Sequence, residues 1–183
     1  MGPDPEADRR LVTVLFADLS GFTTLSERLD PEDVRAFQND LFGEMAGAIA
    51  RYDGFVEKFV GDAVMAVFGA PVAHEDDPER ALRAALAMHE RMVAINHRWE
   101  RRLGRPLALH VGVNTGPVVA GTLGSAAGGS YAVTGDTVNV ASRLQGSAQP
   151  GQTLVSFATH RLDESVAKGF CLRRAEVDTR RVL

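Results

Sequence analysis

Short apolar runs alternate with amphipathic segments along this chain, and their order predicts an α+β fold. The first run, Leu11 to Ala17, is nearly continuous and rich in β-favouring residues, which is typical of a strand in the middle of a sheet. The residues before it are polar and turn-prone, so we expect a flexible lead-in over residues 1–10.

Two long helices are predicted between the strands. Asp30 and Pro31 begin the first one, because Asp is a good N-cap and Pro fits the first helical position. Asp77 is expected to cap the second, whose apolar stripe runs to about Arg102.

Two further apolar runs, residues 55–60 and 63–68, are separated only by Gly61 and Asp62, which predicts a β-hairpin. A strand over residues 107–113, turned at residues 114–117, completes the order β-α-β-β-α-β of ferredoxin-like folds. A helix over residues 137–145 and short strands near residues 153–155 and 170–172 follow. No repeat or linker divides the chain, so we expect one domain over residues 11–183.

Composition narrows the function classes. The net charge of -4 over 183 residues argues against non-specific binding to nucleic acid or to anionic membranes. The single cysteine, Cys171, fits a reducing compartment. No apolar run could span a bilayer and no signal-peptide pattern opens the chain, so we expect a cytoplasmic domain.

Two aspartates stand where the pattern calls for bland turns. Asp18 ends the first strand and Asp62 is at the hairpin tip, and in this topology the two strands are neighbours. Two carboxylates at one place favour Mg²⁺ or Mn²⁺, whose open positions suit phosphate oxygens. Either residue alone is also explained as a helix cap or as a common turn residue.

Two other segments suit a phosphorylated ligand. The turn through Phe22 and Thr23 offers backbone N–H groups at a helix start, a natural phosphate cradle. Asn139 and Arg143 lie one turn apart on a predicted helix, where the guanidinium could stabilise phosphate charge and the amide could hold a ribose. A solvated polar stripe is the alternative interpretation of this helix.

Together these segments resemble the class III adenylyl and guanylyl cyclase catalytic domain over nearly the whole chain. The stretches that carry the resemblance follow the family's order and spacing, and they are residues 16–23 (FADLSGFT), 58–62 (KFVGD), 112–121 (GVNTGPVVAG) and 131–144 (YAVTGDTVNVASRL).

The resemblance implies a two-metal reaction. Asp18 and Asp62 would bind two Mg²⁺ or Mn²⁺ ions, with the Leu19 carbonyl as a further ligand. The ribose 3′-OH would attack the α-phosphate in line and release pyrophosphate. Arg143 matches the family's transition-state arginine, and Asn139 matches the residue that orients the ribose.

The resemblance also implies the substrate and the assembly. Lys58 matches the lysine that reads adenine, whereas guanylyl cyclases carry an acidic residue there, so ATP is the expected substrate. The family works as a head-to-tail dimer in which Lys58, Asn139 and Arg143 serve the metal site of the other subunit. Because this chain holds both sets, a homodimer with two equivalent sites is expected.

Two positions depart from the family pattern. Ala132 stands where adenylyl cyclases usually carry the Asp or Thr that completes base recognition, and Thr134 is a possible substitute. Arg180 aligns with a lysine that grips the terminal phosphates, and the family's last strand is cut short here. We therefore expect a domain excised from a longer regulatory protein.

The leading hypothesis is an adenylyl cyclase that makes 3′,5′-cyclic AMP. Ala132 keeps a guanylyl or mixed-specificity cyclase open as an alternative. A catalytically silent nucleotide-binding domain is a further alternative, although such a domain would not need both aspartates together with Asn139 and Arg143. A polymerase or dinucleotide cyclase is a weaker option, since neither needs the Asn-Arg helix at this spacing.

Overall fold

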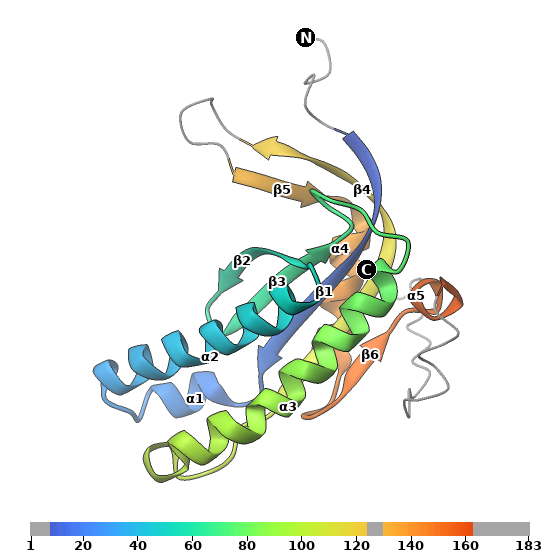
Figure 1. The fold of residues 1–183 in the computed structure, drawn as a ribbon. Helices are drawn as coiled ribbons and strands as arrows, with labels where there is room; N and C mark the ends of the chain where they lie inside the picture. The colour runs from blue at the N-terminus through green and yellow to red at the C-terminus, as the bar shows by residue number, and fades with distance from the viewer. Residues whose placement is uncertain (1–7, 124–129, 163–183) are drawn as a thin grey trace, which may run out of the picture.

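A single sheet organises the computed structural model, which describes residues 8–123 and 130–162. Its described strands lie in the order β2-β3-β1-β4-β5, with β6 parallel to β4 along residues 111–113 (Figure 1). The other pairings are antiparallel. The strands are β1 (Asp8–Leu19), β2 (Phe55–Val60), β3 (Ala63–Phe68), β4 (Leu109–Leu123), β5 (Ser130–Thr134) and β6 (Thr153–Val155).

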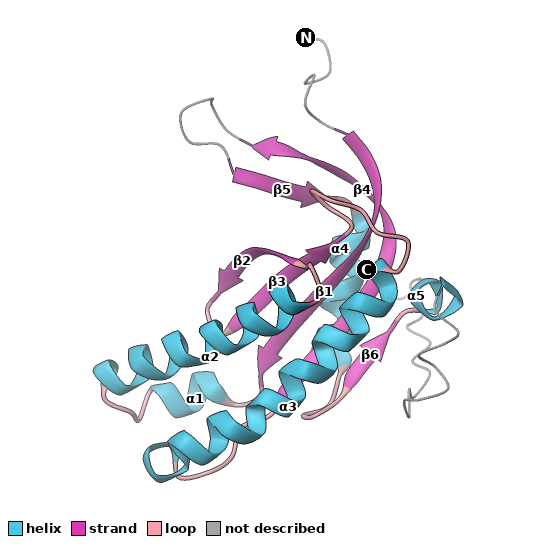
Figure 2. Cartoon of the chain, viewed as in Figure 1, coloured by secondary structure: helices cyan, strands magenta, loops and turns pink. Residues whose placement is uncertain are grey.

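Helices cover both faces of this sheet. The long helices α2 (Pro31–Arg51) and α3 (Asp77–Leu103) lie together on one face, and α4 (Asp136–Ser147) packs against β4 and β1 on the other (Figure 2). The short helices α1 (Phe22–Ser26) and α5 (Phe157–Leu162) follow β1 and β6. The ferredoxin-like order that the sequence predicts is confirmed, as are the added helix and the strand at residues 153–155.

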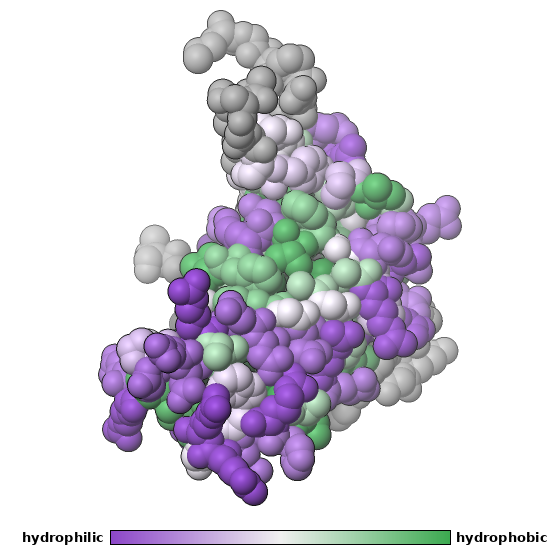
Figure 3. Space-filling model, turned by 60° about the vertical axis from the view of Figure 1, so that its left-hand side comes forward, coloured by the Kyte–Doolittle hydropathy of each residue, from purple (hydrophilic) through white to green (hydrophobic). Residues whose placement is uncertain are grey.

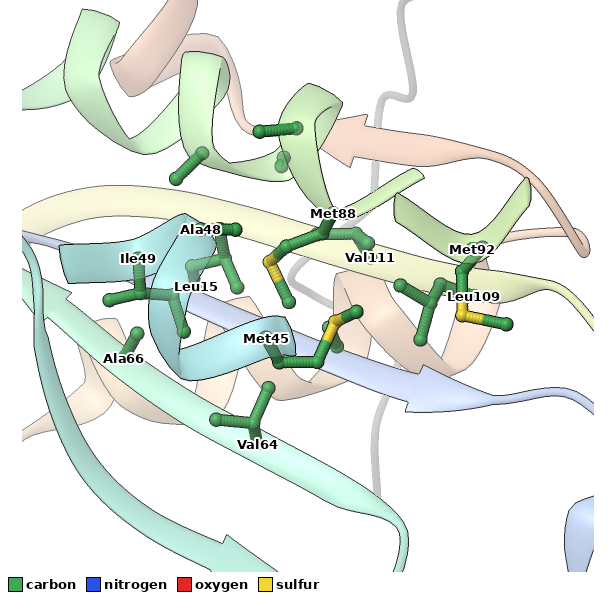
Figure 4. Packing of buried hydrophobic residues seen from close by; sticks show 14 of the residues in the cluster. Leu15, Met45, Ala48, Ile49, Val64, Ala66, Met88, Met92, Leu109 and Val111 are labelled. Atoms are coloured by element: carbon green, nitrogen blue, oxygen red, sulfur yellow. The ribbon is translucent and has the colours of Figure 1, made fainter. Parts of the chain in front are cut away.

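The main core fills the space between the sheet and the α2–α3 layer. Figure 4 shows Met45 and Ile49 of α2, Met88 of α3 and Leu15 of β1 meeting there, and each of these side chains is at most 1% exposed. A second apolar cluster, which includes Met65 and Ala141, lies on the face that α4 covers. Among the described helices, none is both long and apolar enough to cross a membrane.

The start of α2 agrees with the prediction, whereas the start of α3 corrects it. Asp30 caps α2 as predicted, since its Oδ1 accepts the Glu32 backbone N–H at 3.0 Å. Asp76, not Asp77, occupies the N-cap position of α3. Asp77 is the first helical residue, and its buried carboxylate accepts the His74 backbone N–H at 2.8 Å.

Two strand boundaries differ from the prediction. β1 begins at Asp8, which pairs with Ala120, so residues 8–10 are strand and not lead-in. No turn interrupts β4 at residues 114–117, because this stretch stays paired with β1 throughout. Gly116, which suggested a turn, and Gly112 instead let α4 approach closely, since a Cβ on Gly112 would collide with the Gln145 and Ala141 backbone. The predicted strand at residues 170–172 lies outside the described residues.

Candidate active site

Asp18 and Asp62 come together at one end of two neighbouring strands. The register pairs Ala17 of β1 with Val64 of β3, which places Asp18 beside the hairpin tip. Burial, and then the negative charge of Asp18, raise the pKa of Asp62 above its ordinary value. Two partly buried carboxylates that repel each other in this way fit a divalent cation, which would neutralise both.

Backbone contacts hold Asp18 in place. Its Oδ1 accepts the Leu19 backbone N–H at 2.8 Å, and the Ser20 N–H donates to the Ala108 carbonyl at 2.9 Å. The Leu19 side chain is buried, so only its backbone could serve as a ligand. In the described part of the chain, no group of three or more His, Cys, Asp or Glu side chains is placed to hold a metal. The other metal ligands would therefore be carbonyls, water and substrate.

His110 is a neighbour of this pair that the sequence does not reveal. It is the register partner of Asp18 on β4, and its Nε2 lies 3.9 Å from Asp18 Oδ2. Its Nδ1 lies 2.9 Å from the Gln145 carbonyl oxygen. His110 thus connects the carboxylate to α4, and a histidine within an apolar strand gives no sequence signal of that contact.

The turn after β1 is only partly available to a ligand. Gly21 adopts φ 74° at its start, and Thr23 is exposed. The Phe22 side chain belongs to the core, with its ring 4.9 Å from that of Phe37, so Phe22 could offer only its backbone N–H. Arg105 Nη2 donates to the Gly21 carbonyl at 3.0 Å and brings a cation to the same turn.

Asn139 and Arg143 are exposed on the outer face of α4, whereas Ala141 and Leu144 are buried on its inner face. Within the described residues, neither exposed side chain makes a hydrogen bond or ion pair, so both are available to a ligand. No such interaction joins them to Asp18 or Asp62. The structure places the two halves of the expected site on different elements of one chain.

The residues expected to contact the base lie on β2 and β5. The ring centroids of Phe55 and Tyr131 lie 5.8 Å apart, which shows that these two strands approach each other on the α4 face. Lys58 of β2 is half exposed, Ala132 of β5 is buried, and Thr134 at the end of β5 is exposed. Arg180 lies outside the described residues.

Apolar surface gathers near these strands. Figure 3 shows it in the middle of the face that comes forward from the left-hand side of Figure 1. Phe59 and Val60, which follow Lys58 on β2, are 41% and 59% exposed. A patch of this kind is typical of a protein contact.

A model of the adenylate and guanylate cyclase catalytic domain matches residues 6–179. The chain belongs to this family.

Adenylyl cyclases and guanylyl cyclases are both among the proteins that this cyclase domain resembles. It is 42% identical over 139 residues to adenylate cyclase 1 of Rhizobium meliloti, covering 75% of the chain and 21% of that relative. The crystal structure of the adenylyl cyclase CyaB from P. aeruginosa matches with a TM-score of 0.83 at 36% identity, covering 88% and 84% of the two chains. The guanylyl cyclase Cya2 matches with a TM-score of 0.82 at 37% identity, covering 86% and 80%.

The cyclase domain is short beside its curated relatives. It spans 21% of the Rhizobium meliloti protein and 28% of the adenylate cyclase of Anabaena cylindrica. Domains of this family bind a nucleotide and use divalent metals, which agrees with the pairing of Asp18 and Asp62.

Proposed function

We propose that this cyclase domain converts ATP to 3′,5′-cyclic AMP and pyrophosphate. The observation that carries the proposal is the meeting of Asp18 and Asp62, which raises the pKa of Asp62 through burial and the charge of Asp18. Two adjacent carboxylates suit a pair of divalent ions that activate a ribose hydroxyl and neutralise phosphate charge. Lys58, a donor for a ring nitrogen of adenine, supports ATP as the substrate.

The chain's own residues would orient the reacting groups. Asp18, Asp62 and the Leu19 carbonyl would hold the ions, and Asn139 would hold the ribose so that O3′ faces the α-phosphorus. The O3′–P bond forms while the bond to pyrophosphate breaks, and the hydroxyl proton passes to water. Arg143 stabilises the charge that develops on the phosphate oxygens, because its planar fork can form paired hydrogen bonds.

A head-to-tail homodimer is part of the proposal. Asn139 and Arg143 project from α4 without contacting the aspartate pair of their own chain. The apolar surface around β2, including Phe59 and Val60, supplies a face for a second copy. Two shared sites would result, each with metal ligands from one subunit and Lys58, Asn139 and Arg143 from the other.

A guanylyl or mixed-specificity cyclase is the second candidate, and the buried Ala132 side chain favours it. A methyl group there cannot accept a hydrogen bond from the adenine amino group, so part of the base discrimination is missing. One missing hydrogen bond lowers discrimination by about threefold to tenfold.

Parallel assays test the two candidates. The purified domain is incubated with Mn²⁺ and either ATP or GTP, and both cyclic products and pyrophosphate are quantified over a range of protein concentrations. We expect a higher kcat/KM for ATP, and specific activity that rises with protein concentration. A preference for GTP would overturn the substrate assignment. Equal inactivity of the wild type and Asp62→Asn, both dimeric, would instead indicate a silent nucleotide-binding domain.

A further inference from the structure

β2 contains one more residue than the stretch of β3 it pairs with. Val56 pairs with Ala66 and Lys58 with Met65, so Glu57 has no partner across the hairpin. In such a bulge the extra residue is left unpaired and the strand bends locally. Lys58 lies opposite Met65, which belongs to the apolar cluster beneath α4, and the Glu57 carboxylate lies close to the Lys58 ammonium group.

The Glu57 side chain is buried, and one of its carboxylate oxygens has no hydrogen-bond partner among the described residues. It is 8% exposed, and its Oε2 is a buried atom with no hydrogen-bond partner among the described residues. A buried carboxylate without partners is costly, so a counterion is strongly favoured. Among the described residues, the one ion-pair partner of Glu57 is Lys58, whose Nζ lies 3.7 Å from Glu57 Oε1.

Lys58 needs such an anchor if it is to read a base. Its side chain is 52% exposed and has four rotatable bonds, so binding a ligand would restrict it at an entropic cost. The neighbouring Phe59 and Val60 are apolar and cannot hold the ammonium group. Glu57 is the fixed negative charge that limits where this group can lie.

We propose that Glu57 is a positioning residue that holds the Lys58 ammonium group where it meets the purine base. This inference rests on the role proposed above for Lys58. Glu57 acts through Lys58, because burial of its Oε2 keeps that oxygen from the base itself. The bulge lies at Glu57, where the carboxylate and the ammonium group of the next residue come within 3.7 Å of each other.

Steady-state kinetics with ATP test the positioning role. Glu57→Gln keeps the shape of the side chain and removes its charge, so KM for ATP should rise about tenfold while kcat changes less than about twofold. In a Lys58→Met background the same replacement should leave KM unchanged, and Glu57→Asp should restore part of the wild-type value. An equal KM effect in both backgrounds, or none in the wild type, overturns the proposal.

Thermal unfolding gives a readout that needs no turnover. Lys58→Met should lower Tm when Glu57 is present, because it strands a buried charge, and should have little effect beside Glu57→Gln. Glu90→Gln, at an exposed position of α3, is the matched control. Equal Tm losses in both backgrounds would show that the two residues are uncoupled. If the two residues were coupled in Tm but Glu57→Gln left KM unchanged, the positioning role would also be overturned. Failure of the proposed ATP reaction would instead appear as inactivity of the wild type.

Discussion

At the scale of single residues, Asp18 and Asp62 occupy positions that disfavour the fold until a cation is present. Burial and the charge of Asp18 raise the pKa of Asp62 in the folded state above its unfolded value. A raised carboxyl pKa means that the folded state holds its proton more tightly, so stability is lost as pH rises through that pKa. Above it, the charged Asp62 carboxylate is partly buried beside Asp18, which is unfavourable.

Asp62→Asn should therefore stabilise the protein in EDTA while removing its function. The substitution eliminates the repulsion, so Tm in EDTA at pH 7.5 should rise by about 2 °C. It should also abolish the Tm increase that Mn²⁺ gives the wild type, together with cyclic nucleotide production. Thermal scans with EDTA or Mn²⁺ check this, with Glu90→Gln as the control. A lower Tm for Asp62→Asn in EDTA would contradict the expectation.

The sequence predicts some site residues better than others. Asp18 and Asp62 could be found because one lies near the end of β1 and the other in the turn between β2 and β3, where topology fixes the neighbour. Glu57 could not, because a bulge changes which face a residue occupies and leaves no mark on the alternation of apolar and polar positions. The burial of Phe22 could not be predicted from the sequence either, since its contact with Phe37 depends on how α1 packs on α2.

At the scale of elements, the position of α4 depends on bare backbone in β4. A Cβ on Gly112 would collide with backbone atoms of Ala141 and Gln145, which a rotamer change cannot relieve. The glycines at residues 112 and 116 therefore fix the distance between the helix and the sheet. This packing role explains why a glycine- and proline-containing stretch is strand here and not turn.

Gly112→Ala should displace α4 and impair both stability and turnover. We expect a loss of about 1–3 kcal/mol in the free energy of unfolding from overpacking. Turnover should fall more than tenfold, because Asn139 and Arg143 move with the helix. Gly146→Ala, on the open side of the same helix, is the control and should be neutral or slightly stabilising. Urea unfolding and ATP assays measure both; equal behaviour of the two variants would disprove this view of α4.

The contact between α3 and β6 should make the fold sensitive to acid. Burial lowers the pKa of His89, whose Nε2 lies 2.9 Å from the Thr153 hydroxyl. The lower folded-state pKa means that stability is complete above the unfolded value of about 6.5 and is lost as pH falls below it. His89→Gln should lose less stability than the wild type between pH 7.5 and pH 5.5 in urea unfolding. His97→Gln, at an exposed position of α3, should behave like the wild type.

At the scale of the whole molecule, the proposed halves of the site lie on different elements of the chain. The order of strands and helices was predictable from apolar periodicity and from the Gly61-Asp62 split. The distance between α4 and the aspartate pair was not predictable, because it depends on how two layers pack on opposite faces of the sheet.

Mixing two inactive variants tests whether the sites are shared. Asp62→Asn removes a proposed metal ligand and Arg143→Ala removes the proposed transition-state cation, so each variant alone should be inactive. Random exchange makes half of the dimers mixed, and each mixed dimer has one intact site, so about a quarter of wild-type activity should return. A site built within one chain would give no recovery. Mixing Asp62→Asn with Asp18→Asn, which damage the same half, is the control and should stay inactive.

The bulge in β2 also constrains how base preference could change during evolution. Such a change would begin at position 58, where Lys58 is proposed to meet the base. In this chain a single Lys58→Glu step would set a second carboxylate beside the buried Glu57 and remove the ion-pair partner that the described residues give it. An acidic residue at position 58 is therefore acceptable only after Glu57 has been neutralised.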